Sequence, residues 1–258
     1  GTGGNGTGDS NRGIELRAPV QTGGAGTITI NGTAGTGGTS DNFGTYISNL
    51  VKTANGAISI TGTGLGSTDS NDGIRIRGDG SIVATGAASV TLTGNGAASA
   101  PGISIDTTGG IPGPGAVATA GNAFLTAGSG SNIEISPGVI NANGTLELIA
   151  DGSIVLGNGA QIVSNGAGTK NVTLNSDADA IGGGNIPMLA GSSIATSGGS
   201  VVMGGGVNPL VGRATGNGTG FPGAAGIVIM GNISAGAGNV TMRGEGAILS
   251  NKNGEAFM

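Results

Sequence analysis

The chain has 258 residues, of which 60 are glycine, and it contains no His, Cys or Trp. Its formal net charge is -5 with nine Lys and Arg residues, so we do not expect it to bind a phosphate backbone, and nucleic acid is excluded as a partner. Without His or Cys the commonest catalytic bases, nucleophiles and transition-metal ligands are missing, so we expect a protein that is not an enzyme and has no cofactor.

Short segments that alternate apolar and polar residues begin near the N-terminus and predict β-strands. The first is residues 13–17, followed by a weaker apolar position at Val20 and by a third segment at residues 27–31. No window keeps the i, i+3, i+4 apolar spacing of a helix, and no apolar run approaches the length of a membrane span. The sequence pattern therefore predicts an all-β protein.

The same three-segment pattern returns about every 30 residues along the chain. Glycines open the first segments of the early units, at Gly13, Gly44, Gly73 and Gly102, which lie 31, 29 and 29 residues apart. Later first segments begin at Ile133, Ile154, Ile186 and Ile227. Counting from Ile14 gives eight units. In the unit that starts at Ile103, we expect the sequence Ile111-Pro112-Gly113-Pro114 to interrupt the middle strand.

A unit of this size buries too little to fold alone, and its strands can find partners only in neighbouring units. The repeat predicts a right-handed parallel β-helix of about eight coils, each of roughly 30 residues with three short strands. We expect residues 1–258 to form a single β-helical shaft segment of a longer protein. Aliphatic ladders should line its interior, one with Ile14, Ile47, Ile74, Ile103 and Ile133 and another with Ile28, Ile58, Val90, Leu125 and Leu146.

One long loop per unit, such as Gly62–Gly73, consists of Gly, Thr, Ser, Asn, Asp and Ala with little apolar content. We predict that these loops lie outside the core and that shortening them has little effect on folding. On the outward face of the strands, a 29-residue coil would place Arg75 against Ser104 and Arg77 against Asp106. We interpret these pairs as setting register rather than binding a ligand.

Three further outward features are candidate binding sites. A hydroxyl row, formed by Thr29, Ser59, Thr91, Thr173 and Thr241 with Thr27, Thr61 and Thr93 beside it, could bind ice or a crystalline polysaccharide, or could reflect only the β-propensity of Thr. Scattered aromatic rings could contact a glycan or protein partner, and these surface-contact candidates are Phe43, Tyr46 and Phe221. Carboxylates in residues 69–72 and 175–179 could hold calcium, but neither segment matches a known calcium loop, and no metal site is assigned.

Glycoside hydrolysis would require two carboxylates close together. Stacked coils could place Asp106 near Glu134, or Glu147 near Asp177. No acidic cluster recurs together with a basic residue and aromatic platforms, so a polysaccharide-degrading enzyme is the least favoured alternative, and no catalytic residue is assigned.

Three units carry a specific resemblance: residues 144–156 (Gly-Thr-Leu-Glu-Leu-Ile-Ala-Asp-Gly-Ser-Ile-Val-Leu), 171–179 (Asn-Val-Thr-Leu-Asn-Ser-Asp-Ala-Asp) and 197–206 (Ser-Gly-Gly-Ser-Val-Val-Met-Gly-Gly-Gly). They resemble the repeats of filamentous-haemagglutinin-like exoproteins, large bacterial adhesins of the two-partner secretion class. The resemblance implies a β-helical shaft that an outer-membrane partner exports to the bacterial cell surface. It carries no site residues, because neither an N-terminal secretion domain nor a C-terminal effector is visible in the sequence.

These observations predict an extracellular structural and adhesive fibre segment that mediates surface attachment or cell–cell and matrix assembly. Its expected partners are neighbouring segments of the same fibre, through self-association, and host or matrix glycans and proteins. The alternative is a ligand-binding solenoid for ice or carbohydrate.

Overall fold

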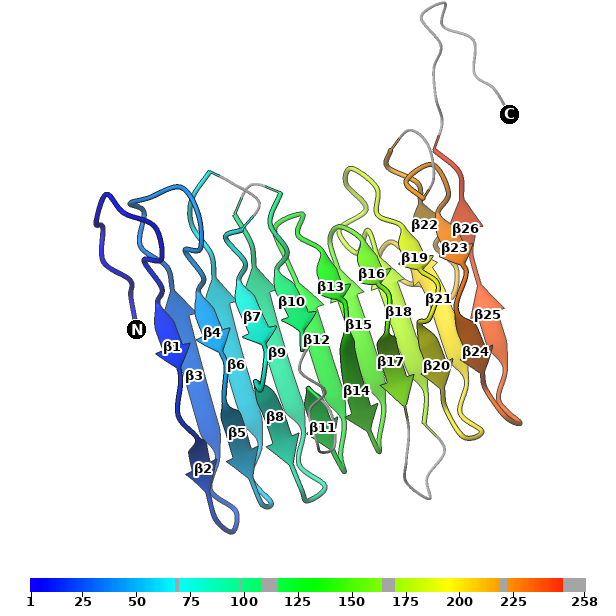
Figure 1. Cartoon of the computed structure of the whole chain (residues 1–258). Helices are drawn as coiled ribbons and strands as arrows, with labels where there is room; N and C mark the ends of the chain where they lie inside the picture. The colour runs from blue at the N-terminus through cyan, green and yellow to red at the C-terminus, as the bar shows by residue number, and fades with distance from the viewer. Residues whose placement is uncertain (68–69, 98, 108–115, 164–169, 219–221, 248–258) are drawn as a thin grey trace, which may run out of the picture.

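The computed structural model describes residues 1–67, 70–97, 99–107, 116–163, 170–218 and 222–247, and every regular element in these ranges is a β-strand. The strands form a parallel β-helix, in which three sheets run side by side along a stack of coils (Figure 1). Among the described residues, no helix has the length and apolarity needed to cross a bilayer.

Each of the three sheets has eight parallel strands in the described part of the chain, one from each coil. The first sheet contains β1 (Ile14–Leu16), β4 (Thr45–Ile47), β7 (Ile74–Arg77), β10 (Ile103–Asp106), β13 (Ile133–Ile135), β16 (Ile154–Leu156), β19 (Ile186–Met188) and β23 (Ile227–Ile229). The second contains β2 (Val20–Thr22), β5 (Leu50–Thr53), β8 (Ser81–Ala84), β11 (Val117–Thr119), β14 (Gly138–Ala142), β17 (Ala160–Val163), β20 (Ser193–Ala195) and β24 (Asn232–Ser234). The predicted all-β fold with three strands per coil is confirmed.

The third sheet has the longest strands and contains β3 (Ile28–Thr33), β6 (Ile58–Thr63), β9 (Val90–Asn95), β12 (Ala123–Ala127), β15 (Leu146–Ala150), β18 (Val172–Ser176), β21 (Val201–Gly205) and β25 (Val240–Met242). A small additional pair, β22 (Ala214–Thr215) with β26 (Gly244–Glu245), lies beyond β23 near the last coils (Figure 1). The unit that starts at Ile103 keeps its middle strand, β11, so the predicted interruption of that strand is wrong. The segment Ile111–Pro114 itself lies outside the described residues.

The core is a closed column of aliphatic side chains that alternate with outward residues along every strand. Strands of the first sheet offer two inward positions, and most strands of the third sheet offer two apolar positions followed by a small residue such as Gly94, Ala127 or Ala150. Each of these sheets therefore contributes two main apolar ladders rather than one. In the first sheet, Thr45 continues the ladder of Ile14 and Ile74, and Ile47 belongs to the ladder of Leu16 and Ile76. The predicted placement of Ile47 beside Ile14 is therefore wrong, although Ile47 is fully buried.

The same correction applies to the third sheet. Ala123 pairs with Val90 and Leu146, whereas Leu125 pairs with Leu92 and Leu148. The sequence pattern identified the inward residues but did not assign them to the two ladders. Two inward residues of one strand lie two positions apart, so placing either of them in a given ladder keeps the alternation of faces. In the second sheet, the weaker apolar position predicted at Val20 recurs in the next two coils, where Val20 pairs with Val51 and Val51 with Ile82.

Glycines near the C-terminal ends of the early third-sheet strands allow the start of the next first-sheet strand to pass close to them. A Cβ atom built on Gly62 would lie 2.0 Å from the carbonyl oxygen of Gly73, and one on Gly94 would lie 1.9 Å from that of Gly102. Backbone oxygens cannot withdraw as a flexible side chain can, so a side chain here would push the first strand out of its sheet. This explains why a glycine recurs at the end of each early third segment.

The long loops gather along one edge of the stack (Figure 1) and hydrogen-bond to one another. Asp9 accepts hydrogen bonds from the backbone N–H groups of Thr39 and Ser40 in the next coil, at 2.8 and 2.9 Å. The ends of the loops that enter the first sheet are buried, since Asn42, Asn71 and Asp72 have no exposed surface. The prediction that the loops lie wholly outside the core is wrong for these positions, where polar rather than apolar groups fill the interior.

Candidate functional sites

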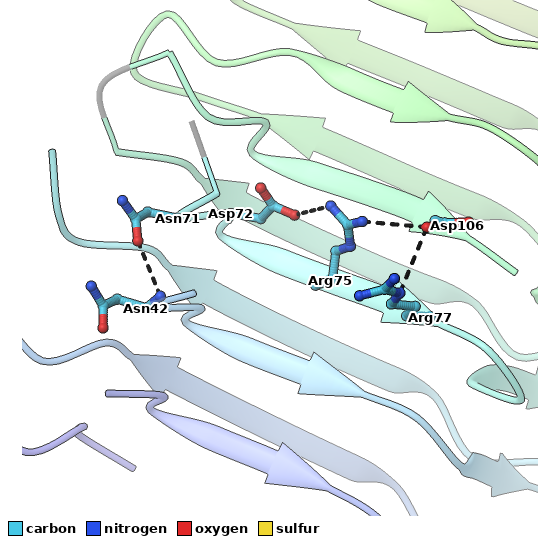
Figure 2. Close-up of polar contacts among 6 residues, drawn as sticks. All are labelled: Asn42, Asn71, Asp72, Arg75, Arg77 and Asp106. Carbon is cyan, nitrogen blue, oxygen red and sulfur yellow. Dashed lines mark hydrogen bonds and ion pairs between the residues drawn. The ribbon is translucent and has the colours of Figure 1, made fainter. Parts of the chain in front are cut away.

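A network of charged side chains crosses the outer face of the first sheet (Figure 2). Arg75, on β7, donates to Asp72 at 2.9 Å and contacts Asp106, on β10, at 3.4 Å. Arg77 approaches the same Asp106 oxygen at 3.7 Å. The predicted neighbours Arg75–Ser104 and Arg77–Asp106 are confirmed by the register of β7 and β10. The network goes further than predicted, because Arg75 links two coils through both carboxylates.

Asp72 is the buried end of this network, with a side chain that has no exposed surface. Burial raises its pKa from 3.8 to about 6, and the nearby positive charge and hydrogen bond of Arg75 only partly offset this effect. One oxygen, Oδ1, has no hydrogen-bond partner among the described residues. A carboxyl with this pKa resembles a general acid in its titration, but its enclosure keeps it from touching a substrate, so we assign it a structural role.

An asparagine ladder runs beside this network along the loop bases. Asn42 Oδ1 accepts a hydrogen bond from the backbone N–H of Asn11 at 2.8 Å, and Asn71 Oδ1 accepts one from that of Asn42 at 3.0 Å (Figure 2). Asn71 Nδ2 also donates to the carbonyl of Thr39 at 2.9 Å. These side chains satisfy backbone groups of neighbouring coils where the loop has no ladder partner.

The predicted aromatic contacts form a small stack in the second coil. The rings of Phe43 and Tyr46 lie 5.6 Å apart and nearly parallel, and the guanidinium of Arg12 lies 4.3 Å from the centre of the Tyr46 ring. Tyr46 points outward as predicted, but Phe43 is only 5% exposed, so its ring offers little surface to a partner. The third candidate, Phe221, lies outside the described residues.

Hydroxyl groups form a two-dimensional array on the outer face of the third sheet. Register places Thr29, Ser59 and Thr91 in one row and Thr61, Thr93 and Thr126 in the next, with Asn31 at the start of the second row. Thr27 precedes β3 and is two residues before Thr29, so the position in line with Thr61 and Thr93 is occupied by Asn31. Phe124 and Glu147 follow Thr91 in the first row, so the hydroxyl array covers β3, β6 and β9 and reaches only the second row of β12.

The proposed carboxylate pairs are not neighbours across the strands. Glu134 lies opposite Ser104, and Asp106 is held by the two arginines. Glu147 lies opposite Thr173, four residues before Asp177. Among the described residues, no group of three or more acidic side chains is placed to hold a metal ion, and Asp69 of the first candidate calcium segment lies outside these residues.

A groove of about 450 Å³ lies farther along the third sheet. Its floor is formed by outward residues of β15, β18 and β21, and one wall is the loop that contains Val207, Asn208, Pro209 and Leu210. Sequence reasoning did not identify this site. The available signal was the aliphatic character of residues 207–211, which is unusual in a chain whose other loops are polar.

Comparisons of this chain with protein-family models, with curated proteins and with solved structures find no match. The fold and the geometry of the sites described above are therefore the basis for functional inference.

Proposed function

We propose that this chain is an extracellular structural and adhesive segment of a bacterial surface fibre. The observation that carries the proposal is the continuity of all three sheets through eight coils of the described chain. At about 4.8 Å per coil, this stack makes a rod of roughly 38 Å in which every coil is fixed to its neighbours by backbone hydrogen bonds. Such a rod sets distance and stiffness and presents its outer residues in regular rows.

The resemblance of residues 144–156, 171–179 and 197–206 to filamentous-haemagglutinin-like repeats supports the same proposal. All three segments contribute strands to the stack, namely β15 with β16, β18 and β21. Membership of this adhesin class, export through an outer-membrane partner and display on the cell surface are parts of the proposal.

The proposal is tested by displaying the chain on a laboratory bacterium and measuring cell aggregation and attachment to glass and to matrix-coated surfaces. Electron microscopy of the displayed material gives the shape of the particles. We expect narrow rods and increased attachment relative to cells that display an unrelated protein of similar size. Globular particles, or attachment equal to that of the control cells, would contradict the proposal.

A second candidate function, binding to ice or to a crystalline polysaccharide, is favoured by the hydroxyl array. Neighbouring residues within a row lie about 4.8 Å apart across the strands, and the two rows lie about 6.7 Å apart along the strands. The hydroxyls of Thr61, Thr93 and Thr126 form no hydrogen bond with any described residue, so they are available to an ordered surface.

Thermal hysteresis and co-sedimentation with microcrystalline cellulose or chitin test this second candidate. Replacing Thr93 with Tyr should abolish either activity, because the larger ring breaks the plane of the array. Replacing Thr241, on β25 of the same sheet, is the matched control. Absence of both activities in the unmodified chain excludes this candidate.

A further inference from the structure

The groove on the third sheet has the dimensions of a binding site. Its volume of about 450 Å³ falls within the range typical of ligand pockets. The loop that forms its wall is held in one shape by Asn208, whose side-chain oxygen accepts a hydrogen bond from the backbone N–H of Leu210 at 3.0 Å. The backbone oxygen of Asn208 accepts further bonds from Val211 and Gly212, at 3.1 and 2.8 Å. A preformed wall lowers the ordering cost of binding.

Two polar groups of the groove lack partners within the described chain, and only one of them is accessible. Asn175 is 6% exposed, and its Oδ1 atom is buried without a hydrogen bond, so a ligand in the groove does not reach that atom. Glu147 forms no ion pair with any described residue and is the sole charged residue among those that line the groove. Lys170 precedes Asn171, which lines the groove. Its ammonium group donates to Asn143 at 2.8 Å and is not paired with Glu147. The unpaired carboxylate of Glu147 therefore makes the site complementary to a ligand that carries positive charge.

Aliphatic side chains supply the rest of the site. Ile149 and Val202 project from the floor, and Val207 and Leu210 line the wall. Val207 is 87% and Leu210 54% exposed, and apolar side chains gathered on a surface in this way mark contact sites for other molecules. Among the described residues, no aromatic ring lines the groove. Such rings are the usual stacking platforms for sugars, so the lining matches aliphatic side chains better than pyranose rings.

We propose that this groove binds a polypeptide segment that presents a Lys or Arg side chain next to aliphatic side chains. The cation would lie against Glu147, and the aliphatic groups would pack against Leu210 and Val202. Only the biological role of this groove, as an adhesive contact of the fibre, rests on the proposed function. Binding to the groove can be measured whether or not the chain forms part of a fibre.

The test uses the ¹⁵N-labelled full chain and a blocked peptide, acetyl-Leu-Arg-Val-Leu-amide, titrated by NMR. A second peptide carries citrulline, which has nearly the shape of arginine without its charge. We expect the amide signals of Glu147, Asn175 and Leu210 to shift, with the arginine peptide binding about fivefold more tightly than the citrulline peptide. Glu147→Gln should remove that difference, and Leu210→Ser should weaken both peptides about tenfold.

Two matched variants control for nonspecific effects. Val211→Ser makes a comparable change at a 71% exposed position of the same loop that does not line the groove. Asp79→Asn removes an exposed carboxylate in the turn between β7 and β8. Both should bind the arginine peptide as the unmodified chain does.

Equal affinity for the two peptides, an unchanged affinity in Glu147→Gln, or absence of shifts at millimolar peptide would each overturn the inference. A chitin oligosaccharide that moves the groove signals while neither peptide does would also overturn it, in favour of a glycan. None of these outcomes affects the rod shape or the attachment assays, so failure of this inference is distinguishable from failure of the proposed fibre function.

Discussion

The outer face of the third sheet differs between its two ends, although the backbone beneath it does not. Over β3, β6 and β9 it carries rows of Thr, Ser and Asn, whereas over β15, β18 and β21 it carries Glu147, Ile149 and Val202 beneath an overhanging loop. Both ends are parallel sheets with the same alternation of buried and outward residues. The comparison shows that stacking constrains the inward positions and leaves the outward positions free to carry different surfaces.

If the two ends share one core, a charge placed inside either end should unfold the protein. Ile74 and Leu174 are both completely buried, one near each end. Replacing either with Asp should cost at least about 4 kcal/mol of unfolding free energy, since an unpaired carboxylate would be enclosed between coils.

Chemical denaturation followed by circular dichroism measures this cost. Thr61→Asp, on the outer face, is the matched control and should change stability by less than about 0.5 kcal/mol. A loss of stability confined to one of the two variants would show that the two ends fold separately. An unchanged transition in Ile74→Asp would show that the inward assignment is wrong.

The second largest expected effect is a change of the unfolding free energy with pH, caused by Asp72. Because burial raises its pKa from 3.8 to about 6, the folded state holds a proton that the unfolded state releases between these values. The free energy of unfolding should therefore fall as pH rises from about 4 to above 6, by on the order of 3 kcal/mol from this residue.

Asp72→Asn should flatten this decline, which denaturation curves at pH 4, 5, 6 and 7 would reveal. Burial also raises the pKa of Glu134 and of Asp177, so a smaller slope of the same sign should remain in the variant. If the variant keeps the whole slope, Asp72 is not the residue that titrates.

The asparagine ladder predicts a smaller loss. Asn71→Ala removes the acceptor for the Asn42 backbone and the donor to Thr39, and leaves a buried N–H without a partner, so we expect a cost of about 2 kcal/mol. Thermal unfolding measures it. Ser70→Ala, at an exposed position beside Asn71, is the control and should have little effect. Similar stability of both variants would mean that the loop bases do not contribute to the fold.

The smallest expected effect is at the hydroxyl array. Thr61→Val keeps the shape and β-branching of the residue, and its hydroxyl bonds to no described residue, so stability should change by less than about 0.5 kcal/mol. Denaturation midpoints would detect a larger change, which would indicate that the array has a structural role that the hydrogen-bond geometry does not show.

Most of the fold could be predicted from the sequence because the repeat places like residues on like residues. The strand starts at Ile133, Ile154, Ile186 and Ile227 follow from periodicity alone and agree with the structure. Periodicity did not separate the two inward ladders, which is why Ile47 and Leu125 were misplaced. It also did not predict the buried loop bases, since Asn42, Asn71 and Asp72 have the composition of exposed turns and are buried only because neighbouring coils satisfy them.

The candidate sites were less predictable. The pairing of Arg75 and Arg77 with the following coil needed only the coil length, and it was correct. The groove beside Leu210 required knowledge of how the loop after β21 folds back over β15 and β18, and loop conformation has no periodic signal. Likewise the burial of Phe43 depends on Arg12 and Tyr46, which reach it from the preceding coil and from the adjoining strand.

The central claim, that successive coils lie in register on one another, can be measured directly by disulfide formation because the chain has no cysteine of its own. Thr61 pairs with Thr93, and Thr173 with Val202, which places each Cα pair about 4.8 Å apart and within bridging distance. Cysteines at Thr61 and Thr91 share the same face but are offset by two residues, about 8 Å apart, which is too far. The account predicts rapid crosslinking of both in-register pairs under mild oxidation and none of the offset pair. Equal crosslinking of the offset pair, or failure of both in-register pairs, would contradict it.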